Sequence, residues 1–446
     1  MRLPLPPPQW DSLLRDATPE VMGKLFSNRS PVVDGNYLHW DKLRHLPPPE
    51  GLTPEQWWVA TKIARSGLLQ PIPPLLDKRG RPFQLAMPEP VLIHLHHIDR
   101  DAAGRIESAA EVATSQRRDR YLVNSLMEEA IASSQLEGAS TTRKVAEAML
   151  REGRKPRDHS ERMIFNNYRT MQAIRTLGTE PITPAMILEL HRLLTDGTLD
   201  DPADAGRLRL ADGIHVVHPD GTSLHVPPPH TELPARLDRL CAFANAPQES
   251  VPFVHPVLRA ILLHFMIGYD HPFADGNGRT ARALFYWAMA RSGYWLMEFL
   301  SISHFLRRAP SQYVRAYLHT KSDDNDTTYF VLHQLNIIRR ALAALHDYLS
   351  RTADEQRSTE RLLATSPRLR SQLNHRQVAL LTHALKHPGE PYRVEAHQHT
   401  HNVVYQTART DLLKLADLGL LTKTKSGKAF VFLAPEDLHL RITGLA

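Results

Sequence analysis

Twelve consecutive residues hold most of the side chains in this sequence that could do chemistry together, from His271 to Arg282 in HPFADGNGRTAR. A histidine is a suitable general base near neutral pH. The carboxylate of Asp275 is a hard oxygen ligand, and carboxylates beside phosphates usually reach them through Mg²⁺. The stretch therefore combines a base with a metal ligand.

The second half of this stretch predicts an anion site. Gly276 and Gly278 flank Asn277, so the backbone there can adopt positive φ and approach a ligand closely. A strongly apolar segment, residues 283–290, follows at once and predicts a helix. A glycine-rich turn that opens a helix directs unpaired N–H groups and the positive end of the helix dipole toward one point.

Two arginines strengthen this prediction. Arg279 and Arg282 are three residues apart, share a face of the expected helix and can both reach an anion held at its start. A lone Gly-Asn-Gly is usually only a turn. The whole set of specified residues within one short stretch makes chance a poor explanation.

The stretch resembles the motif of the Fic family, HxFx(D/E)GNGRxxR, and matches it at every specified position. The resemblance implies that the histidine deprotonates a protein hydroxyl, the acid binds Mg²⁺, and the Gly-Asn-Gly-Arg loop holds nucleotide phosphates. It also implies transfer of AMP from ATP to a Ser, Thr or Tyr side chain of a target protein. One residue departs from the family pattern: Asp270 stands where an apolar residue is common, and we expect it to face solvent.

An earlier helix is expected to carry a second motif. Residues 107–136 lack proline and glycine and have apolar side chains at helical spacing. Gly138 is the natural stop, and Ser133 and Glu137 share one face just before it. By itself this pattern is only a helix end, but it resembles the family's inhibitory motif, (S/T)xxxE(G/N). A bidentate contact of Glu137 with Arg282 would keep that arginine from the γ-phosphate of ATP.

A hairpin is expected at residues 206–226, where short β-prone runs surround a Pro-Asp-Gly turn. It resembles the family's flap, which aligns the target segment as an added strand. A surface hairpin without a role is the alternative. Further helices are expected at 161–177, 184–194, 233–245, 254–269, 303–318 and 329–349. The helix at 254–269 leads directly into His271, so two apolar helices should fix the loop between them.

The N-terminal region is rich in proline, and we expect it to be irregular apart from a helix that starts at Thr53-Pro54. His94, His96 and His97 raise the question of a metal site. No cysteine or acid of suitable spacing accompanies them, so a strand edge is the expectation.

The C-terminal residues 374–446 predict three helices and a small hairpin, which resembles a winged helix-turn-helix with residues 407–415 as its recognition helix. Basic side chains that could meet phosphates are Arg409, Lys414, Lys423, Lys425 and Lys428. No base-reading side chain can be identified. Contact with DNA, contact with another protein and a homodimer all remain open.

Length and composition limit the compartment and the class to which this protein can belong. The chain has 446 residues, a net charge of +6 and a single cysteine, Cys241, which excludes an intrachain disulfide and fits a reducing compartment. No run of eighteen apolar residues and no signal peptide is present, so we expect a cytoplasmic protein without a membrane span. Cys241 is expected to be a buried, inert side chain.

The expected fold is mostly α, with a helical Fic core, a small β-hairpin flap and a C-terminal winged helix-turn-helix. Its predicted parts are a proline-rich region over 1–105, a Fic domain over 106–350, a linker helix over 351–373 and the winged helix over 374–446. The expected activity is protein adenylylation with ATP and Mg²⁺, inhibited through Glu137. The alternatives are another Fic-type group transfer, removal of AMP from a modified target, and a DNA-binding regulator whose core only senses nucleotide.

Overall fold

The structure is a computed structural model that describes residues 3–103, 115–177, 180–218, 220–247, 249–364, 371–426 and 429–444. The chain forms two compact units. The first comprises Met1–Gly104, Glu129–Ser140 and Asp158–Ala341, and the second comprises Arg105–Glu128, Thr141–Arg157 and Leu342–Ala446. Helices dominate both units and the sheets are small, as the sequence predicts. The limits of the four parts predicted from the sequence stay predictions.

The N-terminal part of the first unit has more regular structure than the sequence suggests. Its elements are α1 (Trp10–Arg15), α2 (Pro19–Ser27), α3 (Trp40–Leu43), α4 (Pro54–Ser66), the antiparallel strands β1 (Gln70–Leu76) and β2 (Pro82–Leu85), α5 (Glu89–Ile98) and η1 (Asp99–Ala103). Helix α4 begins where predicted, because Thr53 and Gln56 form a reciprocal capping box.

The three histidines at 94–97 lie on α5, so the prediction of a strand edge is wrong. Val91, Leu95 and Ile98 are buried at intervals of four and three residues, which is the helical period. Proline in the first turn of α5 favours helix initiation.

A buried ion pair and a buried hydrogen bond attach this N-terminal part to the rest of the first unit. Lys62 contacts Asp323 at 2.7 Å, and both side chains are almost fully buried. The guanidinium of Arg65 donates to the Tyr329 hydroxyl at 2.7 Å and to the Leu38 carbonyl at 2.9 Å. Each buried charge thus has a partner, as burial requires.

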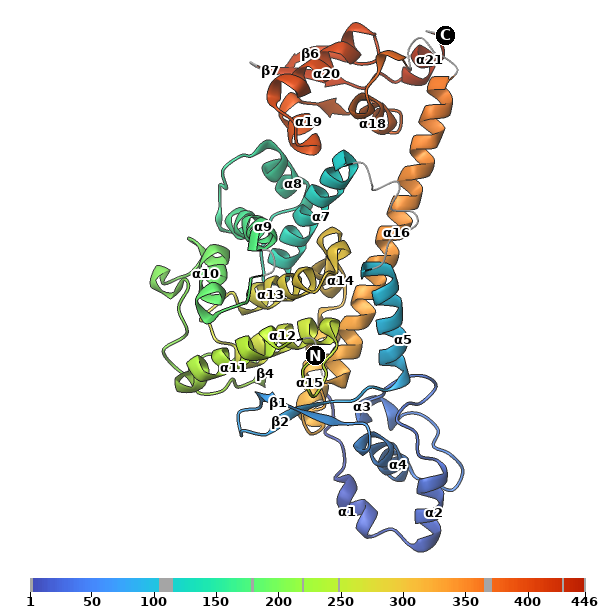
Figure 1. The fold of residues 1–446 in the computed structure, drawn as a ribbon, viewed down its shortest axis with the longest axis vertical. Helices are drawn as coiled ribbons and strands as arrows, with labels where there is room; N and C mark the ends of the chain where they lie inside the picture. The colour runs from blue at the N-terminus through green and yellow to red at the C-terminus, as the bar shows by residue number, and fades with distance from the viewer. Residues whose placement is uncertain are drawn as a thin grey trace. The chain divides into compact units, whose positions relative to one another are not determined.

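The central part of the first unit is a stack of helices (Figure 1). Its elements are α9 (His159–Leu177), α10 (Pro184–Thr195), η2 (Pro202–Asp204), β3 (Val216–Val217), β4 (Ser223–His225), η3 (His230–Glu232), α11 (Leu233–Asn245), α12 (Pro256–Asp270), α13 (Asn277–Arg291), η4 (Trp295–Phe299), α14 (Ile302–Arg308) and α15 (Pro310–Ser322). Helices α12 and α13 lie side by side and are buried along nearly all of their lengths. Helix α12 is predominantly apolar, as a core helix should be, whereas α13 also buries the side chains of Arg279 and Arg282.

Several predicted elements have different limits in the structure. The helix expected at 303–318 is broken before Pro310, which begins α15 and cannot continue α14. Helix α16 (Thr328–Ala364) runs into the predicted linker. Helix α7 (Ser115–Leu136) is described only from Ser115, so its predicted start lies outside the described residues. The hairpin expected at 206–226 is reduced to β3 and β4.

The second unit contains α8 (Arg143–Glu152), which the sequence reading missed and which ends at Gly153 with φ 65°. Its C-terminal part comprises α18 (His375–Ala384), β5 (Pro391–Tyr392), α19 (Val394–His401), α20 (Tyr405–Asp417), β6 (Thr422–Ser426), β7 (Ala429–Leu433) and α21 (Leu438–Gly444). The strands form an antiparallel sheet in the order β5-β7-β6 around an apolar core that includes Leu381, Leu412 and Phe432. The three predicted helices and the hairpin are therefore present, while Lys428 lies outside the described residues.

Within the described part of the chain, no helix combines the length and the apolar character that crossing a membrane would need. Cys241 is buried, as expected.

Candidate active site

The loop from His271 to Gly276 connects the end of α12 to the start of α13. His271 is the C-terminal cap of α12, with φ 46°, and its N–H donates to the Ile267 carbonyl at 3.0 Å. Gly276, with φ 79°, precedes the first residue of α13. Left-handed backbone at a non-glycine residue is uncommon and is concentrated at functional sites. His271 and the helix start are thereby fixed at the two ends of one short turn.

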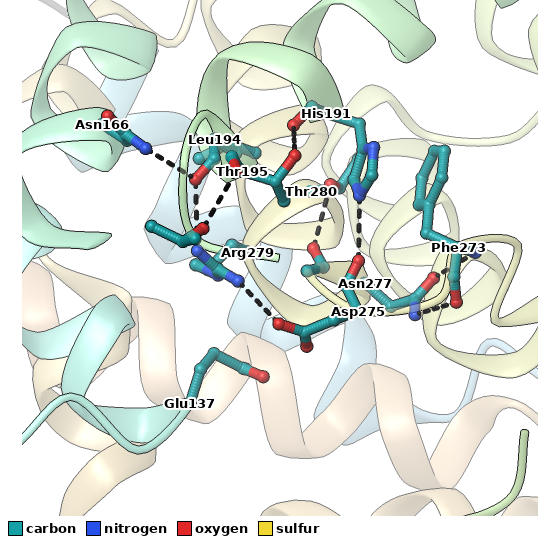
Figure 2. Close-up of polar contacts among 12 residues, drawn as sticks. Glu137, Asn166, His191, Leu194, Thr195, Phe273, Asp275, Asn277, Arg279 and Thr280 are labelled. Atoms are coloured by element: carbon teal, nitrogen blue, oxygen red, sulfur yellow. Dashed lines mark hydrogen bonds and ion pairs between the residues drawn. The ribbon is translucent and has the colours of Figure 1, made fainter. Parts of the chain in front are cut away.

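Asn277 holds the shape of this loop (Figure 2). Its Oδ1 accepts from the Phe273 N–H and its Nδ2 donates to the Phe273 carbonyl, both at 2.9 Å. The Phe273 ring is fully buried and stacks on His191 with a centroid separation of 3.8 Å. The two amide atoms of Asn277 are therefore used inside the loop.

His191 was missed by the sequence reading and supports the loop from α10. Its Nδ1 accepts from the Gly206 N–H at 3.0 Å, so Nε2 carries the proton and donates to the Asp275 carbonyl at 2.9 Å. Burial lowers the pKa of His191 to about 4, which keeps the ring neutral. A Cβ at Gly276 would lie 2.7 Å from Thr195 and 3.2 Å from this ring, so only glycine fits there. No sequence spacing distinguishes His191 from an ordinary core histidine.

Arg279 links the predicted metal ligand to the core. Its Nη2 donates to Asp275 Oδ2 at 3.1 Å, and its Nη1 donates to the Leu194 carbonyl at 3.1 Å (Figure 2). The Arg279 side chain is fully buried, whereas that of Asp275 is 61% exposed. No group of three potential ligands occurs among the described residues, so a divalent cation here would share Asp275 with substrate oxygens and water. That arrangement suits Mg²⁺.

Arg282 is held by the two residues that the second motif predicts. Its Nε donates to Ser133 Oγ at 2.8 Å, and its Nη2 donates to Glu137 Oε1 at 2.8 Å and to the Ser133 carbonyl at 3.2 Å. The arginine side chain is 1% exposed and that of Glu137 is 26% exposed. Within the described residues, Nη1 of Arg282 has no hydrogen-bond partner. The expected contact is thus made through one carboxylate oxygen and not as a bidentate pair.

The Glu137 carboxylate occupies the space beside the start of α13. A Cβ built on Gly278 would lie 2.1 Å from Glu137 Oε1 and 3.1 Å from Arg282 Nη1. Gly278 therefore leaves room for an acidic group next to these arginines. Gly138, with φ 98°, lies after the end of α7 as predicted.

The supporting end of α7 is fixed by a second acid that sequence spacing does not reveal. Glu129 is 2% exposed and accepts from Ser301 Oγ at 2.9 Å and from the Ser303 N–H at 3.1 Å. Because Glu129 lies on α7 and Glu137 directly follows the last residue of this helix, these bonds limit how far the Glu137 carboxylate can move.

His271 is positioned to accept a proton. Its side chain is partly exposed, and burial lowers its pKa below the usual 6.5, against opposite effects of the Gly268 carbonyl and Glu137. The ring is consequently neutral at physiological pH. A neutral imidazole at the mouth of the loop can act as a general base.

Asp270 is buried, so the expectation that it faces solvent is wrong. It is 4% exposed and pairs with Arg236 at 3.2 Å, and Arg236 also donates to the carbonyls of Leu76 and Asp77 at 2.8 Å. Burial raises the pKa of Asp270 to about 7. Carboxylates are usually exposed, but Asp270 is buried because an arginine from α11 reaches the end of α12 and provides the partner that a buried charge requires.

The segment expected to form a flap is attached to the loop at two points. Arg209 donates through Nε to the His271 carbonyl at 3.0 Å and through its backbone N–H to the Pro272 carbonyl at 2.9 Å. On β4, Nε2 of His225 lies 2.6 Å from the Tyr269 carbonyl. On β3, Val217 is 56% exposed. The hairpin is short, but it is placed directly beside His271.

Residues 181–289 match the Fic/DOC family model, and this segment includes the whole stretch from His271 to Arg282. This chain is a Fic/DOC family protein. It therefore has a Fic-type helical core, and the sheets of the described residues are small, with two or three strands.

The Fic/DOC chain is similar to insect proteins named protein adenylyltransferase Fic. It is 29% identical to that of Drosophila grimshawi over 198 residues, which are 44% of this chain and 38% of the relative. It is 36% identical to that of Drosophila sechellia over 113 residues, which are 25% of this chain and 21% of the relative. The matches thus span less than two fifths of these relatives. A Fic family protein from Desulfovibrio desulfuricans superposes with a TM-score of 0.49 and 19% identity, over 78% of this chain and 97% of that one.

The matched segment of this Fic/DOC protein leaves out Ser133 and Glu137. Ser133 contacts Arg282 from the last turns of α7 and Glu137 does so from just after its end, more than forty residues before the segment begins. The contact therefore joins the family segment to a part of the chain that the family model does not cover.

Proposed function

We propose that this protein transfers AMP from ATP to a Ser, Thr or Tyr hydroxyl of a target protein. The proposal is supported chiefly by one arrangement: a neutral, partly exposed His271 next to a helix start that carries two buried arginines. A base beside a phosphate-binding loop is what nucleotidyl transfer to a hydroxyl requires. The names of the similar insect proteins agree with this activity.

In the proposed reaction, His271 takes the proton of the target hydroxyl as its oxygen bonds to the α-phosphorus of ATP. The bond from the α-phosphorus to the oxygen bridging to the β-phosphate breaks, and pyrophosphate leaves. The N–H groups at the start of α13 and the guanidinium of Arg279 stabilise the charge that moves onto the phosphates. Mg²⁺ held by Asp275 would neutralise part of the same charge when bound.

We further propose that Glu137 restrains this activity. The contacts on the Arg282 guanidinium come from Ser133 and Glu137, and the carboxylate fills the space over Gly278. A γ-phosphate that needs Arg282 must compete with these groups. With Glu137 in place, ATP would bind in a pose unsuited to attack.

We propose that the short hairpin binds a segment of the target protein. Its strand β3 has an exposed edge residue, Val217, and its attachment through Arg209 holds it beside His271. An extended target segment could pair with such an edge through main-chain hydrogen bonds. The hydroxyl to be modified would then lie opposite the base.

The C-terminal part of the second unit, α18 to β7, has the element order of a winged helix-turn-helix, and we propose that fold for it. Lys423 and Lys425 on β6 are exposed. Val404 and Tyr405, at the start of α20, are also exposed, at 68% and 47%. A salt-titrated gel shift tests DNA binding: loss of binding with rising salt, reduced further in Lys423→Ala, supports phosphate contacts.

The central test uses ATP labelled on the α- or the γ-phosphate, with wild type, Glu137→Gly and His271→Ala. α-Label on protein that increases in Glu137→Gly and disappears in His271→Ala supports AMP transfer. γ-Label on protein indicates a kinase instead. Absence of both labels together with tight, sequence-specific DNA binding would favour a nucleotide-sensing regulator.

A further inference from the structure

A cleft opens in the first unit and shares no residue with the loop at 271–282. Its volume is about 680 Å³, and its walls come from residues 35–39, Lys42, the start of α5, α15 and the first turns of α16. This volume lies in the range of pockets that bind metabolites. Neither the base nor the phosphate loop of the proposed reaction lies in it.

Two imidazoles in this cleft each have one ring nitrogen without a hydrogen-bond partner among the described residues. His319 is 7% exposed, and its Nε2 has no hydrogen bond within the described residues; Asp41 Oδ2 lies 4.0 Å from it. His333 lines the same cleft, and its buried Nδ1 is likewise without a partner among those residues. Buried polar atoms in folded proteins are nearly always paired. The two ring nitrogens therefore point to a polar ligand or to ordered water.

The aromatic wall of the cleft is rigid. The rings of His39 and His319 stack at 4.1 Å with an angle of 8° between their planes. Nδ1 of His39 accepts from the Asp41 N–H at 3.1 Å, and its Nε2 lies 3.1 Å from Ser322 Oγ. Both nitrogens of His39 are thus occupied, and the stack fixes the position of His319.

Positive charge exceeds negative charge around the cleft. Lys42 is exposed and has no ion pair within the described part of the chain, and Arg315 is half-buried. The acid that faces them, Asp41, already contacts Arg315 at 3.4 Å. A second acid lies deeper: Asp323 is bound to Lys62. The electrostatics therefore favour an anion.

The histidines add donors and acceptors and little charge. Burial lowers the pKa of His39 to about 2 and those of His94, His319 and His333 to about 4. Neutral imidazoles could also bind a metal ion. However, no set of three potential ligands occurs among the described residues, and Lys42 and Arg315 would repel a cation.

We propose that this cleft binds a small anion with a phosphate or carboxylate group, which accepts from Lys42, Arg315 and the unpaired ring nitrogen of His319. Charge-assisted hydrogen bonds of this kind are the strong contacts in such sites. The proposal goes beyond AMP transfer and does not depend on it, because the cleft and the 271–282 loop use different residues.

Calorimetric titration of the full-length protein with inorganic phosphate and with citrate tests the proposal. Arg282→Ala serves as the background, so that binding at the α13 start is weakened. The test variant is Lys42→Ala with Arg315→Gln. Its matched control is Lys144→Ala with Arg192→Gln, which removes the same charges from exposed positions on α8 and α10.

We expect one-to-one binding of at least one probe, weakened about tenfold or more in the test variant and unchanged in the control. Binding of phosphate alone identifies a phosphoryl ligand, and binding of citrate alone identifies a carboxylate ligand. Lys42→Ala alone, at an exposed position, gives the same direction of change if the double variant does not fold. No saturable binding of either probe, or binding that the test variant leaves unchanged, overturns the proposal.

A spectroscopic measurement assigns the site. Histidine ring ¹⁵N resonances should shift on addition of the bound probe, and one shifting resonance should be missing in His319→Gln. Shifts confined to the ring of His271 would place the anion at the other site and contradict the proposal.

Discussion

Changing Glu137 to glutamine tests how strongly Arg282 is restrained. The substitution keeps the shape of the side chain and removes its charge. In the structure, Glu137 Oε1 lies 2.8 Å from Nη2 of an arginine that is 1% exposed, while Glu137 itself is 26% exposed. A hydrogen bond to a charged group contributes about 1.5–3 kcal/mol. Because Glu137 is partly solvated, the lower half of that range applies.

If a γ-phosphate competes with Glu137 for Arg282, the substitution weakens the competing contact by about 1.5–2 kcal/mol. The free energy of ATP binding should become more favourable by the same amount. This corresponds to a roughly ten- to thirtyfold lower Kd for ATP. A similar increase is expected in the rate of α-label incorporation, since a correctly held triphosphate is the reacting species.

The two quantities can be measured by calorimetry and by label transfer to the protein itself. Glu189→Gln is a suitable control, because Glu189 is an exposed acid on α10 that pairs with Arg192 at 2.6 Å, away from the loop. The control should match wild type in both assays. If Glu137→Gln also matches wild type in both, the competition for Arg282 is refuted, even if the contact persists in the structure.

Three further predictions follow from the loop and its supports. His271 can act as a base only when its ring is neutral, so activity should be lost as the pH falls through its pKa. Label transfer by Glu137→Gln should therefore have an acidic midpoint below pH 6.5. A midpoint above 6.5 contradicts the lowering of the His271 pKa by burial. Phe273→Ala should cost about 3–5 kcal/mol in urea unfolding, whereas Phe253→Ala, at a 62% exposed position, should cost little; equal losses would argue against the buried anchor. The raised pKa of Asp270, about 7, gives a stabilising contribution that is complete below pH 3.8 and is lost as the pH rises to about 7. The unfolding free energy of wild type minus that of Asp270→Asn should therefore fall between pH 4 and 8, and a flat difference would exclude a raised pKa.

Much of the fold could be read from local sequence patterns. The helices α9 to α12 have strong apolar periodicity or a proline at their first turn, and their predicted limits lie within a few residues of those observed. Helix α8 was missed because it is short and polar, and α5 was misread because histidines and β-prone residues obscured its period. The reduced hairpin shows that turn chemistry locates a bend better than it sets strand length.

The residues of the candidate site likewise divide into those that local sequence patterns identify and those that they do not. The residues that act through backbone shape or through a local motif, such as Gly276, Gly278 and Asp275, were named from spacing alone. The contact of Glu137 with Arg282 was reached through the resemblance of two motifs. The supports from distant elements, His191 and Arg236, have no local pattern, because each is defined by what the fold brings next to it.

The way in which Asn277 is used has a consequence for selectivity among nucleotides. Its amide is fully engaged with the backbone of Phe273, and the neighbouring donors belong to main-chain N–H groups and guanidinium ions. Such donors read oxygen atoms bonded to phosphorus and give no information about a purine or pyrimidine edge. Discrimination between ATP and other nucleoside triphosphates must therefore arise from surfaces that contact the nucleobase. Substitutions in this turn should weaken the binding of all of these triphosphates to a similar extent.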